Sequence, residues 1–193
     1  MKRTFLFLVA IALYFSVLSQ EKIKQKEVGF VFSNFDNFGL LLKRGNDKAM
    51  WRYTTMLLAG TKQEYPTDSV TISNLGFSLG IGNEFRKKVT DNFEFCFGYD
   101  VTYSYSLNKS DNLRPFPKSG ITKTSYHTPG INLVFGINYI VKEHLVLGVE
   151  VLPYYRWVWK NVYDKYDTLL SESKGYEYGI SNTSARLSIA YRF

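Results

Sequence analysis

Apolar and polar side chains alternate with a period of two along most of this chain. In segment 93–107, Phe93 and every second residue up to Leu107 are aromatic or aliphatic, and the residues between them are small, polar or charged. Such alternation is typical of β-strands whose two faces meet different surroundings. The pattern predicts about eight strands, near residues 26–33, 38–44, 49–59, 70–85, 93–107, 125–141, 145–159 and 176–193.

The size of the two sets of side chains predicts which face points outward. Phe, Tyr, Trp and Leu dominate the apolar set, whereas the interior of an eight-stranded barrel is only just wide enough for side chains to fill and cannot hold so many rings. A soluble barrel with this set inside is therefore disfavoured, and we expect the apolar set to face lipid. The other set is mostly small and polar, and its charged members are Arg52, Glu84, Glu94, Asp100, Glu150, Arg156 and Arg186.

These charged residues predict a paired network inside the lumen. Counting from the short turns places Asp100, Glu150 and Arg186 at similar heights. The main interpretation is a structural plug, because an eight-stranded barrel is filled by side chains. The alternative is a gate that opens onto a narrow, porin-like ion path.

The amino end predicts export. Lys2 and Arg3 precede an apolar run at 5–18, which is shorter than the ~20 residues that a spanning helix needs. We expect a cleaved signal peptide at 1–19 and a single barrel domain at 20–193. Cleavage would remove two of the positive charges and lower the net charge from +7 to +5. Cys96 is the only cysteine, so an internal disulfide is excluded.

The last strand ends at an aromatic residue, with Leu187, Tyr191 and Phe193 on one face. These residues resemble the carboxyl-terminal signal of Gram-negative outer-membrane barrels. In architecture, the whole segment 20–193 resembles small barrels of the OmpA and OmpX type. The resemblance implies an all-β, eight-stranded, antiparallel up-and-down transmembrane barrel in the cell outer membrane, inserted by the barrel assembly machinery.

Connections of unequal length support this orientation. Short links alternate with longer ones near 60–69, 108–124 and 161–175, as short periplasmic turns alternate with longer external loops. A basic rim on the second long link is a candidate contact for lipopolysaccharide phosphates, and a solvated loop is the alternative. Its residues are Lys109, Arg114, Lys118 and Lys123.

One pair of residues is a weak candidate for a catalytic site. His127 and Ser125 are in phase with the lipid-facing set near the outer end of their strand. They resemble, in residue type, the external His and Ser of outer-membrane enzymes that modify lipid A. A triad also needs an orienting acid, and the sequence places none there. Pro129 and Pro153 interrupt two strands, either as bulges or as a loosened seam that admits a lipid tail.

The sequence thus favours a non-enzymatic outer-membrane barrel with a structural or surface-interaction role. A lipid A-modifying enzyme and a narrow gated channel are the alternatives. We expect outer-membrane lipids and lipopolysaccharide as partners, a monomer, and no cofactor or metal. Nucleic-acid binding is not expected, because basic residues are scattered rather than clustered with aromatic ones.

Overall fold

The structure is a computed structural model that describes residues 25–34, 37–65, 70–112, 122–164, 166–180 and 185–193. The predicted signal peptide, its cleavage point, and the loop residues Arg114 and Lys118 lie outside these ranges. Among the described residues, no helix is long and apolar enough to cross a membrane.

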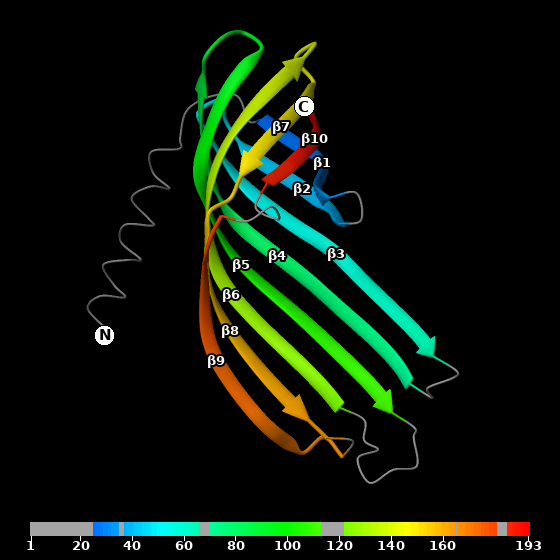
Figure 1. Ribbon diagram of the computed structural model, residues 1–193. Coiled ribbons are helices and arrows are strands. Elements are labelled where there is room, and N and C mark those ends of the chain that lie inside the picture. Colours follow the sequence, from blue (N-terminus) through cyan, green and yellow to red (C-terminus); the bar gives the residue numbers. More distant parts are fainter. Residues whose placement is uncertain (1–24, 35–36, 66–69, 113–121, 165, 181–184) are drawn as a thin grey trace, which may run out of the picture.

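Ten strand segments make up a single antiparallel sheet that closes on itself (Figure 1). The first and last segments pair with each other, and β1 to β6 pair in the order in which they follow one another along the chain. The segments are β1 (Gln25–Asn34), β2 (Asn37–Gly45), β3 (Ala49–Tyr65), β4 (Val70–Lys88), β5 (Phe93–Asn112), β6 (Thr122–Val141), β7 (Leu145–Val151), β8 (Tyr154–Tyr163), β9 (Leu169–Gly179) and β10 (Ala185–Arg192).

These ten segments correspond to eight barrel strands, because the last two strands are each divided in two. β7 and β8 both pair with β6, and they are separated at Leu152 and Pro153. β9 pairs with β8, and β10 pairs with β7 and β1. The predicted class is therefore confirmed: the protein is an all-β, eight-stranded, closed antiparallel barrel.

The predicted long link at 161–175 is wrong, because most of it is strand. β8 continues to Tyr163 and β9 begins at Leu169, so the connection is a short turn. The Asp164 carboxylate accepts hydrogen bonds from the backbone N–H groups of Tyr166 and Thr168, both at 2.8 Å, and shapes this turn. The period-of-two pattern did not predict the first part of β9, because Leu169 and Leu170 are adjacent and residues 171–174 are serine, glutamate, serine and lysine.

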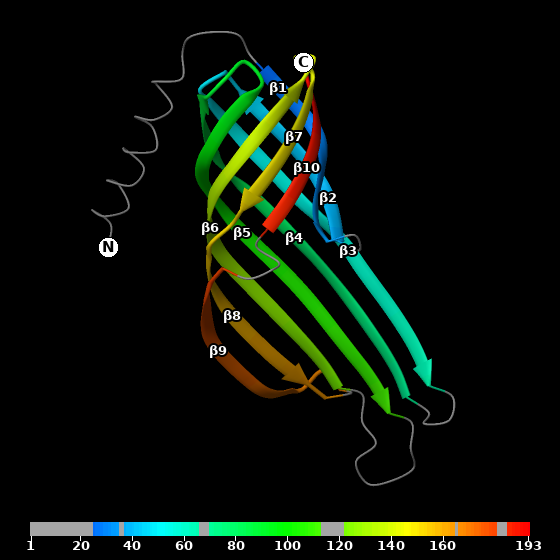
Figure 2. The same cartoon turned by 45° about the horizontal axis from the view of Figure 1, so that its top comes forward.

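The barrel has two parts of different construction. In the first, which we call the closed half, β1, β2, β7 and β10 complete the wall beside one end of β3 to β6 (Figure 2). β1 and β2 have 10 and 9 residues, whereas β5 and β6 have 20 each. Beyond the closed half, β3, β4, β5, β6, β8 and β9 continue as a curved sheet, which we call the extension (Figure 1).

The two faces of the sheet differ as the alternation predicts. Outward-facing apolar side chains such as Leu79, Val101 and Ile137 are about half exposed. Inside the closed half, a small apolar cluster fills part of the interior, and charged and amide side chains fill the rest. The buried members of the apolar cluster are Val31, Leu41, Val146 and Ala190.

The seam that closes the barrel depends on one glycine. Gly29 of β1 faces Ala190 of β10, and a Cβ built on Gly29 would lie 2.5 Å from the Cα of Ala190. A real Cβ cannot approach backbone so closely, so any larger residue must push β1 and β10 apart. Gly175 of β9 offers the opposite case, since nothing lies within 4 Å of the corresponding position.

We therefore expect Gly29→Ala to lower the free energy of unfolding by about 1–3 kcal/mol, the usual cost of overpacking. Gly175→Ala is the control, and its effect should stay within about 0.5 kcal/mol. Denaturant titration of detergent-folded protein measures both. Equal effects of the two substitutions would show that the β1–β10 seam does not require glycine.

Candidate functional site

The lumen of the closed half holds a dense set of ionisable side chains. They are brought together because inward positions of seven strand segments converge on one narrow interior. Nine of them are buried, and Arg186 is half-buried. The bases are Lys43, Arg52, Arg86, Arg186 and Arg192, and the acids are Glu27, Glu84, Glu94, Asp100 and Glu150. Five bases face five acids, so the formal charges of the set cancel.

Glu84 of β4 is the centre of this network. Its carboxylate accepts hydrogen bonds from Lys43 Nζ at 2.7 Å, from Arg52 Nη1 at 3.0 Å and from Arg86 Nε at 2.7 Å. Arg52 also donates two hydrogen bonds to Glu150, at 2.7 and 3.2 Å. One carboxylate thus joins cations from three adjacent strands, and Arg52 connects that group to β7 on the opposite wall.

A second layer lies toward the end of the barrel where the chain terminates. Arg86 forms a two-point hydrogen bond with Glu27, at 2.7 and 2.8 Å. Arg192 donates its Nε to Glu27 at 2.7 Å and its Nη2 to Glu94 at 2.9 Å. Since Arg86 contacts both Glu84 and Glu27, the two layers form one continuous network.

The layer nearest the extension is less completely paired. Arg52 Nε lies 3.2 Å from the Asp100 carboxylate in an ion pair, but the geometry is not that of a hydrogen bond. Both carboxylate oxygens of Asp100 are buried without a hydrogen-bond partner, and so are Asn132 Oδ1 and Arg186 Nε. Buried polar atoms are normally satisfied, so these groups mark a place where the barrel has spare hydrogen-bonding capacity.

The structure places the seven predicted lumen residues in three situations. Arg186 faces Glu150 across the β7–β10 register, but no salt bridge within 4.0 Å joins them. Arg156 lies in the extension, where its guanidinium stacks 4.1 Å from the centre of the Tyr154 ring. The other five, Arg52, Glu84, Glu94, Asp100 and Glu150, meet in the network described above.

Four members of the network were absent from the predicted set: Glu27, Lys43, Arg86 and Arg192. They lie near strand ends, and Arg86 is one residue beyond the strand predicted at 70–85. Their spacing from predicted inward-facing residues could have identified them. Arg86 is two positions from Glu84, and Arg192 is six positions from Arg186, so each falls on the inward face.

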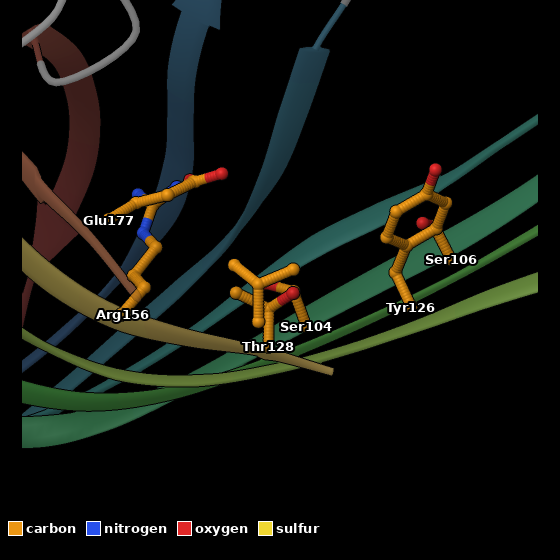
Figure 3. A pocket seen from close by; sticks show the side chains of 7 residues that line it. Ser104, Ser106, Tyr126, Thr128, Arg156 and Glu177 are labelled. Atoms are coloured by element: carbon orange, nitrogen blue, oxygen red, sulfur yellow. The ribbon is translucent and has the colours of Figure 1, made fainter. Parts of the chain in front are cut away.

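The extension holds a polar hollow of about 310 Å³ on its inner face (Figure 3). The close view shows the Arg156 and Glu177 side chains together on one side, Thr128 and Ser104 between, and Tyr126 with Ser106 on the other. Val158 completes the lining. Hydroxyl groups therefore dominate the hollow, and a single cation and a single carboxylate lie at one side of it.

In the outward pair of His127 and Ser125, the histidine contacts two tyrosine side chains. His127 Nδ1 and the Tyr103 hydroxyl form a hydrogen bond of 2.7 Å, and the Tyr105 ring lies 5.0 Å from the imidazole. Ser125 is buried, and among the described residues no carboxylate forms a hydrogen bond with His127. Pro129 lies where the β6–β8 pairing skips residues, and Pro153 lies between β7 and β8.

The basic rim is described only in part. Lys123 Nζ forms an ion pair of 3.1 Å with Asp167 and lies 5.8 Å from the centre of the Tyr163 ring. Lys109 faces Lys123 across the β5–β6 register and is exposed. Within the described ranges, no group of histidine, cysteine and acidic residues is arranged to hold a metal ion.

The proposed assembly signal lies on the outer face of β10 and just beyond it. Leu187, Tyr191 and Phe193 are all about half exposed or more. The Tyr191 ring lies 5.0 Å from that of Phe193, and the Phe193 backbone N–H donates to the Lys26 carbonyl at 2.9 Å. The last residue is therefore held in the sheet, and its ring points away from the barrel.

The network predicts a large difference between two glutamate substitutions. Glu84→Gln should lower the free energy of unfolding by about 3–5 kcal/mol, because three buried cations lose a shared counter-charge. Glu172→Gln is the control: its ion pair with Lys174 is exposed, and its loss should cost about 1 kcal/mol or less. Denaturant titration in detergent measures both, and a small effect of Glu84→Gln would contradict the network.

Comparison with known proteins supports the fold and gives no family. No family model matches the chain, and no curated protein matches it in sequence. Among solved structures, it is similar to a major outer membrane protein from Thermus thermophilus, with a TM-score of 0.58 and 13% sequence identity. The match covers 89% of this chain and all of that one. The comparison therefore supports the closed-barrel fold.

Proposed function

We propose that the protein is a barrel of a Gram-negative outer membrane, with a lumen sealed by paired charges and a structural or surface-interaction role. The observation that carries this proposal is the buried network around Glu84, which fills the interior of the closed half together with the small apolar cluster. We further propose that the chain is not an enzyme, since His127 contacts Tyr103 and Tyr105 rather than an orienting acid.

The outer surface supports a location in lipid. β1 and β2, with 10 and 9 residues, have the length that a tilted strand needs to cross a bilayer core. Aromatic pairs lie near the end of the barrel that carries Phe193, where the rings of Phe93 and Tyr139 are 4.9 Å apart. A second group, which includes Tyr155 and Trp157 at 4.9 Å, lies in the extension. Two separated aromatic belts are typical of proteins that cross a membrane.

The contrast between the two parts supports different roles: the closed half seals the barrel, and the extension makes surface contacts. Charges that cross-link β2, β3, β4, β5, β7 and β10 keep a narrow barrel filled, which favours a plug over an open pore. The extension then presents loops and a polar inner face outside the sealed part. Lys109 and Lys123 lie there, and we propose that they contact lipopolysaccharide phosphates.

Conductance in planar bilayers tests the sealed lumen. The unmodified barrel should give no ion steps, because buried and paired side chains occupy the lumen of the closed half. Arg192→Met should add little conductance, since Glu84 and its three cations still close the lumen. Regular ion steps from the unmodified protein, or a sharp rise in conductance with Arg192→Met, would favour a gated channel.

The assembly role of the last residue has its own test. Phe193→Ala should reduce the amount of heat-modifiable barrel in the outer-membrane fraction of cells more than it reduces the yield of detergent refolding. Ile180→Ala is the matched control, because Phe193 and Ile180 are 67% and 68% exposed. Recovery of the unmodified protein in the soluble periplasmic fraction would overturn the membrane location itself.

A further inference from the structure

The extension is open to its surroundings along one side. β9 pairs with β8 and, among the described residues, has no second strand partner. The end of β3 beyond Ala59 likewise pairs only with β4 in the described part of the chain. β1 and β2 end before this level, so the inner face of the extension can be reached from the side as well as from the loops (Figures 1 and 2).

The hollow on that inner face has the size of a small binding site. Its volume of about 310 Å³ is at the lower end of the range typical of ligand pockets, roughly 300–1,000 Å³. It therefore suits one or two sugar rings or a lipid headgroup rather than a large molecule. The two strands that supply its hydroxyl groups, β5 and β6, are paired along this whole level.

The chemistry of the lining indicates a hydroxyl-rich ligand. Four of the seven lining residues, Ser104, Ser106, Tyr126 and Thr128, carry hydroxyl groups that both donate and accept hydrogen bonds. The Ser104 hydroxyl donates to Ser78 at 2.8 Å, which fixes its orientation. A ligand with several hydroxyl groups can both donate hydrogen bonds to these side chains and accept hydrogen bonds from them.

The charged residues of the hollow indicate that the ligand also carries an anionic group. Arg156 and Glu177 face each other across the β8–β9 register, yet no salt bridge within 4.0 Å joins them. The Arg156 guanidinium is instead held by stacking on Tyr154, which leaves its N–H groups available for a ligand. Glu177 would repel a plain anion, but its carboxylate can accept hydrogen bonds from sugar hydroxyls.

Polar atoms without hydrogen-bond partners lie deeper along the same strands. Below the hollow, Asp100 and Asn132 lie on the same inward faces of β5 and β6 as Ser104 and Thr128. Asp100 Oδ1 and Oδ2, Asn132 Oδ1 and Arg186 Nε are buried without hydrogen-bond partners. Asp100 and Asn132 are 1% and 2% exposed, so these polar atoms are buried below the hollow and are not part of its lining.

We propose that this hollow binds a sugar that carries one anionic group, a phosphate or a carboxylate. Arg156 holds the anion, the hydroxyl side chains of β5 and β6 bind the ring, and Glu177 accepts from a sugar hydroxyl. The ligand is either a soluble acidic sugar or the phosphorylated sugar headgroup of a lipid that enters from the open side. The proposal names the partner of the surface-interaction role proposed above and rests on that role.

Binding to purified, detergent-folded protein tests the site without reference to its location in cells. Glucose 6-phosphate should bind in isothermal titration, and glucose should bind at least about tenfold more weakly, because it lacks the charge-assisted hydrogen bonds to Arg156. Arg156→Gln should weaken glucose 6-phosphate binding by a similar factor. Lys174→Gln is the matched control, since it removes an exposed positive charge from the outer face of the same sheet.

Two further measurements separate the alternatives. Glu177→Ala should weaken glucose 6-phosphate binding, whereas a gain in affinity would indicate a plain anion site and overturn the sugar assignment. Nanodiscs that contain lipid A, compared with nanodiscs that contain phosphatidylglycerol, test the lipid source. If the protein retains lipid A and Arg156→Gln abolishes this retention, the ligand is a lipid headgroup. If the protein binds only glucose 6-phosphate, the ligand is a soluble sugar.

The proposal is overturned if neither probe binds, or if Arg156→Gln and Lys174→Gln affect binding equally. A failure of this kind leaves the membrane location and the sealed lumen untouched, because fractionation and conductance measure those independently. A soluble protein that still binds glucose 6-phosphate through Arg156 would instead overturn the proposed location and keep the sugar site.

Discussion

The ion pairs around Glu84 are what allow this barrel to close around a charged interior. An eight-stranded barrel has an interior too narrow for bulky rings, so the large apolar side chains must face outward. The interior is then left to small and charged residues, and buried charges are tolerated only when they are paired. Glu84 meets this requirement for three cations at once, and Arg52 and Arg86 extend the pairing to Glu150 and Glu27.

The same requirement for pairing explains why the two halves of the molecule differ. In the closed half, strands on all sides supply partners for each charge, and the network is continuous from Arg192 to Arg52. At the start of the extension the wall is no longer complete, and fewer strands supply partners for the buried charged side chains. Asp100 and Arg186 lie at this boundary, which is why their polar atoms are buried without hydrogen bonds. Polar atoms without hydrogen-bond partners therefore lie next to the part of the sheet that is open on one side.

Much of the architecture could be predicted from periodicity alone. Phe93 to Leu107 and their counterparts on the next strand specify two faces, and the size of their side chains specifies which face is outside. Two predictions could not be made this way. The first part of β9, residues 169–174, lacks an apolar alternation and forms because its backbone pairs with β8. Lys43 and Glu27 lie at strand ends, and their role depends on which cations and acids the opposite wall brings to the same height.

Local patterns along the chain were therefore enough to specify the number of strands, their inward and outward faces, and the presence of a charged lumen, because each depends on residues close together in sequence. The identity of the charges that meet depends instead on the folded barrel. Arg156, which shares the inward phase of Glu150, lies in the extension, whereas Arg192 joins Glu27 across 165 positions. Register and strand length between distant segments govern such contacts, and hydrogen bonding around the closed sheet determines both.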